Sequence, residues 1–288
     1  MQQGAPMVRH GRVTDHVIVV SVDGLRPDAI KKYHAKTIER LMNEGRYSLT
    51  AQTIKTSLTL PSHTSMLTGV DETVHHVTWN SDKTKEKGYV QVPTIFALAK
   101  EQGFSTAAFF SKTKFHHLEI PSTLDYSRSP HGSAMNSMFS AERTEEYFGQ
   151  YLVHAKPNVT FVHFMEADFM GHTFGWMGKM YGQAVREVDR NVARLLSDAD
   201  ARFGKGNYTV ILTADHGGHG KRHGSTDARD MTIPWVVWGH GVQRGDTLSG
   251  IRTMDTAATV LWLLGVDAPS NFMGRAVTDA FAPQLTSR

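Results

Sequence analysis

Short runs of β-branched and other apolar residues recur along the chain, and several end at a glycine or at a polar residue. Such runs predict buried strands at 17–22, 105–110, 158–164, 208–213 and 234–238, with a further extended segment at 47–53. Helical spacing and helix-boundary residues predict helices at 27–33, 37–44, 61–68, 92–102, 141–154, 176–203 and 253–264. Because strands and helices alternate, we expect an α/β fold: a single domain with a largely parallel central sheet flanked by helices.

The first sixteen residues are polar and contain glycine and proline, so we expect an N-terminal tail at 1–16 and one domain at 17–288. Residues 112–140 lack a clear period, which indicates a long loop or small insertion near the active face. The start of the chain lacks the apolar core of a signal peptide. We expect a periplasmic or secreted protein if a signal has been removed, and a cytoplasmic one otherwise.

Composition excludes several classes of function. The 288 residues are 40% hydrophobic and 20% charged, as in ordinary globular proteins. Thirty-one basic and 28 acidic residues are spread without a block, which argues for neither nucleic-acid nor membrane binding and is compatible with a small, weakly anionic substrate. No apolar stretch approaches the roughly 18 residues of a membrane span. The absence of cysteine excludes disulfides, thiolate zinc sites and cysteine nucleophiles. The oligomeric state stays open.

Carboxylates and imidazoles gather where the predicted strands end. Parallel strands deliver the residues after their carboxyl ends to one edge of the sheet, and oxygen and nitrogen ligands suit Zn²⁺. Taken singly, each such residue is more often a cap, a turn former or a surface histidine. Together they predict a metal site. The six candidate ligands are Asp23, Asp168, His172, Asp215, His216 and His223.

Thr59 is the candidate nucleophile. Pro61 follows it closely, and proline is favoured at the first position of a helix, so Thr59 is expected just ahead of a helix N-terminus. The positive potential there would help a hydroxyl to act as a nucleophile.

Several strings together resemble the alkaline phosphatase superfamily, and within it the type I phosphodiesterase and nucleotide pyrophosphatase group. They are Asp23-Gly24, Thr59-Leu60-Pro61-Ser62-His63, Asn80, Asp168-Phe169-Met170-Gly171-His172, Asp215-His216-Gly217 and His223-Gly224. They occur in the right order between about residues 17 and 264.

This resemblance implies two zinc ions and hydrolysis of a small phosphate ester through a covalent phosphothreonine. Asp23, Asp215 and His216 would hold one ion together with Thr59. The other ion would be held by Asp168, His172 and His223. Asn80 would donate a hydrogen bond to a phosphoryl oxygen. Mn²⁺ also accepts such ligands.

The chain departs from the group at positions that affect the substrate. Leu60 follows the nucleophile where an aromatic residue is usual, and His163 stands where a tyrosine is common, so stacking on a nucleotide base would lose surface. Ser62 replaces a common asparagine. Sulfatases of the same fold need a cysteine or serine followed by an arginine, whereas this chain has Thr59 and His63.

Three hypotheses remain open from the sequence. The first is a two-zinc phosphodiesterase, and the second is a phosphomonoesterase or phosphonate hydrolase of the same superfamily. The third is a metal- or phosphate-binding protein without turnover. Charge favours a diester weakly, because two Zn²⁺, three carboxylates and a Thr59 alkoxide sum to zero and no cationic clamp for a dianion stands out. Lys112 and Lys114 follow a predicted strand and could face the active site, with solvated charges as the default interpretation.

Overall fold

The computed structural model describes residues 11–131 and 138–282, which form a seven-stranded sheet in the order β2-β7-β6-β1-β5-β3-β4. The strands are β1 (Val17–Val22), β2 (Arg46–Gln52), β3 (Thr106–Phe109), β4 (Tyr126–Arg128), β5 (Val159–Phe164), β6 (Thr209–Thr213) and β7 (Thr232–Gly239). Among these strands β7 runs antiparallel to both neighbours and the other pairs are parallel. The predicted α/β domain with a largely parallel sheet is confirmed.

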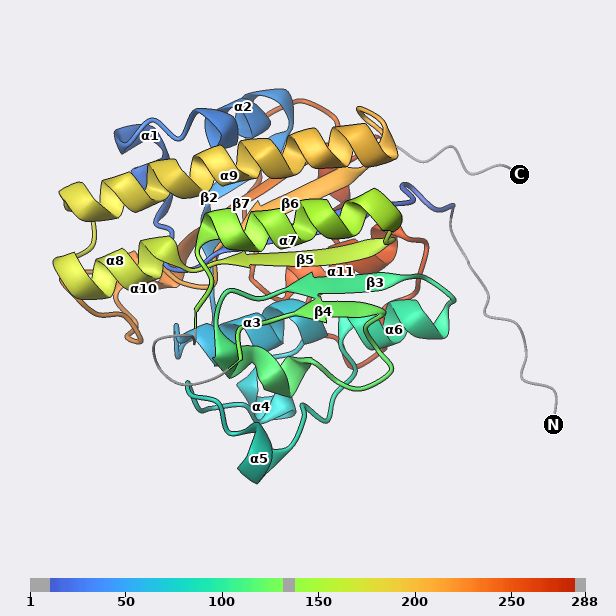
Figure 1. The fold of residues 1–288 in the computed structure, drawn as a ribbon, viewed down its shortest axis with the longest axis horizontal. Coiled ribbons are helices and arrows are strands. Elements are labelled where there is room, and N and C mark those ends of the chain that lie inside the picture. The colour runs from blue at the N-terminus through green and yellow to red at the C-terminus, as the bar shows by residue number, and fades with distance from the viewer. Residues whose placement is uncertain (1–10, 132–137, 283–288) are drawn as a thin grey trace.

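Helices cover both faces of the sheet (Figure 1). One layer contains α1 (Pro27–Lys32), α2 (Lys36–Glu44), α7 (Ala141–His154), α8 (Glu166–Phe174) and the long α9 (Lys179–Phe203). The other contains α3 (Thr59–Thr68), α6 (Ile95–Glu101) and α11 (Asp255–Leu263). Short helical turns complete the fold: α4 (Glu72–His75), α5 (Thr84–Lys87), α10 (Ala228–Met231), η1 (Thr113–Leu118) and η3 (Thr278–Ala280).

Strand β1 lies at the centre of the sheet, and all six of its residues are buried. Its β-branched side chains suit a strand that is covered on both faces. In register, Val19 pairs with Phe161 of β5 on one side and with Ile211 of β6 on the other. The carboxyl ends of β1, β5 and β6 therefore meet at one edge of the sheet.

Strand β7 contains a proline although it lies inside the sheet. Pro234 has no N–H to donate, so a regular ladder would lose a hydrogen bond there. The neighbouring β2 has a register shift between Ser48 and Ala51, which pair with Trp235 and Ile233 and leave Pro234 opposite an irregularity. The carbonyl of Pro234 still accepts from the Thr213 hydroxyl at 2.8 Å. The irregularity in β2 thus accommodates the proline.

The structure adds elements that the sequence pattern did not predict. Asp168 was expected just after a strand, and it lies there in the first turn of α8, a helix that begins only two residues after β5 ends. Thr59 is the first residue of α3 rather than the residue ahead of it. The segment 112–140, expected as a loop or insertion, contains η1 and the edge strand β4, and its residues 132–137 lie outside the described part.

Residues 11–16 of the expected tail pack on the domain, and residues 1–10 lie outside the described residues. The Val13 amide donates to the carbonyl of Leu263 at 2.9 Å, and the His16 ring stacks on Phe203 at 4.1 Å between centroids. Within the described ranges, none of the helices combines the length and apolarity needed to cross a bilayer.

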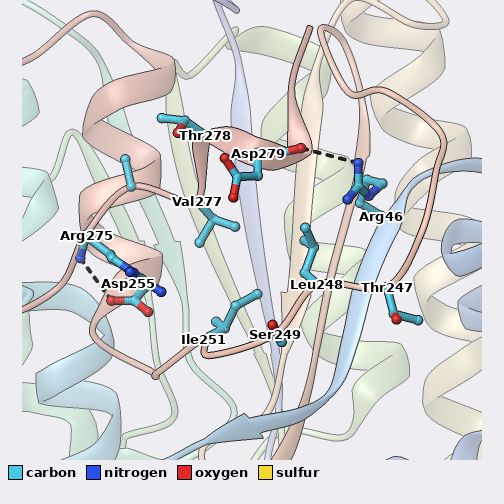
Figure 2. A pocket seen from close by; sticks show the side chains of 11 residues that line it. Arg46, Thr247, Leu248, Ser249, Ile251, Asp255, Arg275, Val277, Thr278 and Asp279 are labelled. Carbon is cyan, nitrogen blue, oxygen red and sulfur yellow. Dashed lines mark hydrogen bonds between the residues drawn. The ribbon is translucent and has the colours of Figure 1, made fainter.

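A polar hollow of about 350 Å³ lies beside β2 (Figure 2). Arg46 there donates to the carbonyl of Asp279 at 3.3 Å, and the amide of Arg275 donates to the carboxylate of Asp255 at 2.9 Å. The described residues that line this hollow include none of the candidate metal ligands.

Candidate metal centre

The ends of three neighbouring strands bring the candidate ligands together. Asp23 follows β1, Asp168 follows β5 within α8, and Asp215 and His216 follow β6. Gly24 permits the close approach of the first two elements, because it has a φ of +71° and a Cβ there would lie 2.9 Å from the Cα of Asp168. The amide of Asp168 donates to the carbonyl of Asp23 at 3.0 Å. Backbone atoms therefore hold the segment after β1 close to helix α8.

The three candidate histidines are oriented in the same way. Nδ1 of His216 lies 2.8 Å from the carbonyl of Gly217, that of His223 2.8 Å from the carbonyl of Ser57, and that of His172 3.0 Å from the carbonyl of Lys221. A carbonyl only accepts, so Nδ1 carries the proton in each ring and Nε2 keeps its lone pair. Such partners commonly fix the tautomer of a metal-binding histidine.

Each of the three carboxylates leaves one buried oxygen without a hydrogen-bond partner among the described residues. These are Oδ1 of Asp23, Oδ1 of Asp168 and Oδ2 of Asp215. Nε2 of His216 lies 3.4 Å from the first and 3.2 Å from the third, and Nε2 of His172 lies 3.3 Å from the second. Two ligands of a tetrahedral Zn²⁺ stand roughly 3.3 Å apart, given metal–ligand bonds of about 2 Å. The unpartnered oxygens and their spacing fit metal ions.

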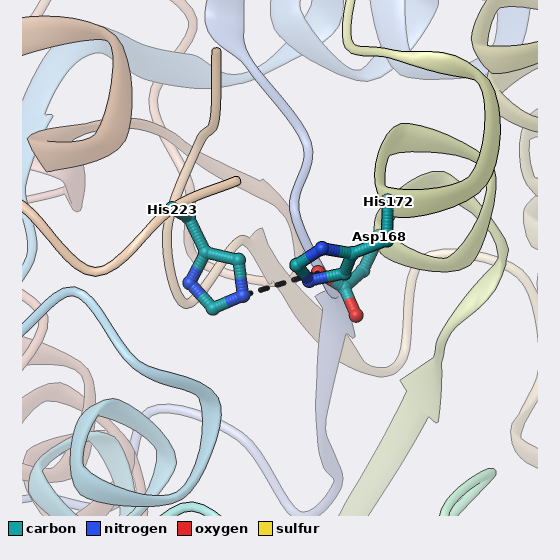
Figure 3. Close-up of side chains that lie close together, drawn as sticks. All are labelled: Asp168, His172 and His223. Atoms are coloured by element: carbon teal, nitrogen blue, oxygen red, sulfur yellow. Dashed lines mark ion pairs between the residues drawn. The ribbon is translucent and has the colours of Figure 1, made fainter. Parts of the chain in front are cut away.

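The ligand atoms form two overlapping groups. Asp168, His172 and His223 converge from α8 and from the loop after β6 (Figure 3). Asp23, Asp168 and His216 form the second group, in which Asp168 takes the place expected for Asp215. Nε2 of His216 nevertheless lies closer to Asp215, at 3.2 Å, than to Asp168, at 4.0 Å. We therefore assign Asp215 to the same ligand group as His216. Asp168 lies close to the ligand atoms of both groups.

Thr59 and Asn80 adjoin this cluster. The Thr59 side chain is fully buried, and its Oγ1 lies 3.4 Å from Nε2 of His216. Oδ1 of Asn80 accepts from the amide of Leu60 at 3.1 Å and from the ammonium of Lys114 at 3.0 Å. Because its oxygen is engaged, the Asn80 amide nitrogen is left as a donor beside Thr59.

Two lysines belong to the site, and the interpretation of Lys112 as a solvated charge is wrong. Its ammonium lies 2.6 Å from Oδ2 of Asp23 and 2.6 Å from Oδ2 of Asp168, with 11% of the side chain exposed. Burial opposes this charge, but the two carboxylates raise the pKa of Lys112. Lys114 lies deeper than expected, and burial together with the Lys112 charge lowers its pKa to about 8. The feature of the sequence that could have identified both lysines as site residues is their position directly after a predicted strand.

The charges inside the cluster separate the pKa values of its members. Burial raises the pKa of Asp215 well above its usual range, and the charges of Asp23 and Asp168 add to this. Burial acts on Asp23 in the same sense, but Lys112 and His163 hold its pKa well below its usual range. Burial and then His223 lower the pKa of His216 to about 3. His216 is therefore neutral at physiological pH, as a ligand must be.

Comparison with known proteins places the chain in a family. The profile described as type I phosphodiesterase / nucleotide pyrophosphatase matches residues 17–223. A bis(5'-adenosyl)-triphosphatase from Homo sapiens is 26% identical over 70% of this chain and 47% of its own length. The chain spans only 14% to 47% of the length of the curated relatives it matches.

Solved structures share the fold. Murine ectonucleotide pyrophosphatase / phosphodiesterase 5, an inactive variant in complex with AMP, superposes with a TM-score of 0.76 at 15% identity, covering 93% of this chain and 100% of that one. The alkaline phosphatase PafA superposes with a TM-score of 0.73 at 14% identity, covering 93% and 99%. The chain belongs to the type I phosphodiesterase / nucleotide pyrophosphatase family.

Proposed function

We propose that this protein is a two-metal phosphodiesterase that hydrolyses its substrate through a covalent phosphothreonine at Thr59. One observation carries the proposal. The Thr59 hydroxyl lies at the first turn of α3, 3.4 Å from Nε2 of His216, in a cluster whose three carboxylates each leave one buried oxygen free. A protein that only binds metal or phosphate needs no hydroxyl in that place.

The chain would hold the two ions with separate sets of ligands. Asp168, His172 and His223 would bind one ion, and Asp23, Asp215, His216 and Thr59 the other. Zn²⁺ suits this set of carboxylates and imidazoles, and Mn²⁺ also accepts it. When bound, the ions would stabilise negative charge on the attacking and leaving oxygens of the phosphoryl transfer.

The protein's own groups would then carry two displacement steps. Oγ1 of Thr59 loses its proton and forms a bond to phosphorus, while the bond from phosphorus to the leaving oxygen breaks and the leaving oxygen takes up a proton. Water next attacks phosphorus and gives up a proton, and the bond to Oγ1 breaks as Oγ1 takes up a proton, which restores the hydroxyl. The amide nitrogen of Asn80 would donate to a phosphoryl oxygen in both steps, and the N-terminus of α3 adds positive potential.

The substrate we propose is a small phosphodiester or pyrophosphate. A human relative is named a bis(5'-adenosyl)-triphosphatase, and a structure of the same fold holds AMP. Leu60 is fully buried, so it offers no surface on which a base could stack. We therefore propose the ester chemistry of the relatives with a weaker preference for nucleotides.

The test compares the native chain with Thr59→Ala on bis-(p-nitrophenyl) phosphate, p-nitrophenyl phosphate and p-nitrophenyl sulfate. We expect about two bound metal ions per chain in both proteins and a loss of diester turnover on the order of 10³-fold or more in the variant. Native protein without bound metal, or equal turnover by Thr59→Ala, would refute the mechanism.

A second candidate is hydrolysis of phosphomonoesters, and the two buried lysines favour it. With Lys112 and Lys114 both charged, the site gains up to two positive charges beyond the ions, which would balance a dianionic phosphoryl group. A diester carries one negative charge fewer. The ratio of monoester to diester turnover therefore separates the two candidates.

Lys114→Met tests this second candidate without removing a contact to a candidate ligand. If monoesters are the substrate, their kcat/KM should fall roughly 10-fold to 100-fold, as expected for the loss of one charge-assisted hydrogen bond, while diester turnover changes little. The matched control is Lys85→Met, which removes an exposed lysine from α5. Equal losses for both ester classes would remove the case for a monoester clamp.

A further inference from the structure

A fully buried histidine lies directly beneath the candidate metal centre. His163 is on β5, and both nitrogens of its ring have a partner. Nε2 lies 3.0 Å from Oδ2 of Asp23, and Nδ1 lies 2.7 Å from the hydroxyl of Ser111. The contacts connect the ends of three adjacent strands, β3, β5 and β1.

The partners fix the direction of these hydrogen bonds. A carboxylate only accepts, so Nε2 carries the proton and donates it to Asp23. Nδ1 then has a lone pair and accepts from the Ser111 hydroxyl. Every donor in this chain of contacts points towards Asp23, so the tautomer of His163 is set by its two neighbours.

The hydrogen bond from His163 determines which oxygen of Asp23 faces the candidate metal centre. Oδ2 accepts from His163 and from the ammonium of Lys112. Oδ1 has no partner among the described residues and lies 3.4 Å from Nε2 of His216. Rotation of the carboxylate would break two hydrogen bonds in a buried place, so His163 helps to hold Oδ1 in position.

The ring of His163 packs against other buried rings. Its ring lies 4.6 Å from that of Phe115 and 4.9 Å from that of His63. An imidazole in such a place is costly unless its polar atoms are bonded. Packing alone therefore does not account for a histidine here, whereas the pair of hydrogen bonds to Ser111 and Asp23 does.

We propose that His163 is a positioning residue that orients Asp23 and selectively strengthens the binding of one of the two metal ions. Its ring bonds to Asp23 and not to His172 or His223, so it acts on the ion held by Asp23, Asp215 and His216. The inference rests on the proposed function, since it takes Asp23 as a metal ligand. Partners of this kind, bonded to a ligand rather than to the metal, commonly change metal affinity by 10-fold to 100-fold.

The experiment titrates zinc into apoprotein against a chromophoric chelator and counts the ions bound. In His163→Leu, which keeps the volume but removes the donor, we expect one site to weaken by roughly 10-fold to 100-fold and the other to change far less. His163→Gln can still donate an amide N–H towards Asp23 and should restore most of the lost affinity. Ser111→Ala should weaken the same site by a smaller factor.

His117→Leu is the matched control, because His117 is also a buried histidine but its Nε2 bonds to the hydroxyl of Thr64, at 3.0 Å, and not to a candidate ligand. It should bind both ions with native affinity. Thermal melts establish that each variant is folded. Native affinity in His163→Leu, equal weakening of both sites, or no rescue by His163→Gln would overturn the inference. Failure of the native protein to bind zinc would instead overturn the proposed function.

Discussion

Gly24 determines how closely the first two candidate ligands approach each other. Its backbone has a positive φ, and the Cα of Asp168 lies where a side chain would begin. A substitution there has two separate effects. One is the strain of a left-handed conformation for a residue with a Cβ, and the other is displacement of α8 from Asp23.

The two effects can be separated by a pair of variants. Gly24→Ala and Gly103→Ala both place a Cβ on a residue with positive φ, but Gly103 has open space around it. Each should lose about 1 kcal/mol of the free energy of unfolding, measured in urea, and Gly24→Ala should lose somewhat more. Only Gly24→Ala should also lose zinc affinity. A normal zinc titration for this variant would show that the close approach is not needed.

At the scale of elements, two acidic side chains meet where α7 packs on α9. A Cβ on Gly149 would lie 2.3 Å from a carboxylate oxygen of Asp198 and 3.8 Å from one of Glu145, so the helices meet closely beside both groups. Burial raises the pKa of Glu145 to about 7, with a hydrogen bond to Asp198 and its charge acting in the same sense. The stability of the contact between α7 and α9 should therefore depend on pH.

The direction in which stability changes with pH follows from the pKa of Glu145 in the folded and unfolded states. A Glu145 carboxyl whose pKa is about 7 in the folded protein and near 4.5 in the unfolded chain keeps its proton longer when folded. The folded state thus loses stability as pH rises from about 4.5 through about 7. Glu145→Gln should flatten this dependence and gain on the order of 1 kcal/mol at pH 8. Glu146→Gln, an exposed neighbour, is the control. Parallel pH profiles for native protein and Glu145→Gln would contradict the assignment.

Elements with a strong local signal could be predicted from the sequence. Residues 17–22 are apolar and β-branched except for Ser21, residues 209–213 are all apolar or β-branched, and both strands were predicted from this pattern. Helix α8 was missed because it starts at Glu166, directly after a strand, and includes Gly171, which has a low helix propensity. Strand β4 has only three residues, which is too short for a period to appear.

The candidate ligands were predicted because they follow strands that could be predicted. The environment of Lys112 was not, because its partners Asp23 and Asp168 are 89 and 56 residues away. The role we propose for His163 depends on contacts with Ser111 and Asp23, which are 52 and 140 residues away. A side chain whose surroundings come entirely from distant segments leaves little local signal in the sequence.

At the scale of the whole molecule, the central place of β1 has a consequence for synthesis. β1 is the first strand along the chain, yet it pairs only with β5, which ends at Phe164, and with β6, which ends at Thr213. A ribosome adds about 5–20 residues per second, so the apolar segment Val17–Val22 emerges roughly ten seconds before a partner strand exists. During that interval the segment exposes apolar surface of the kind that chaperones bind. The candidate metal ligands can come together only after β5 and β6 have paired with β1.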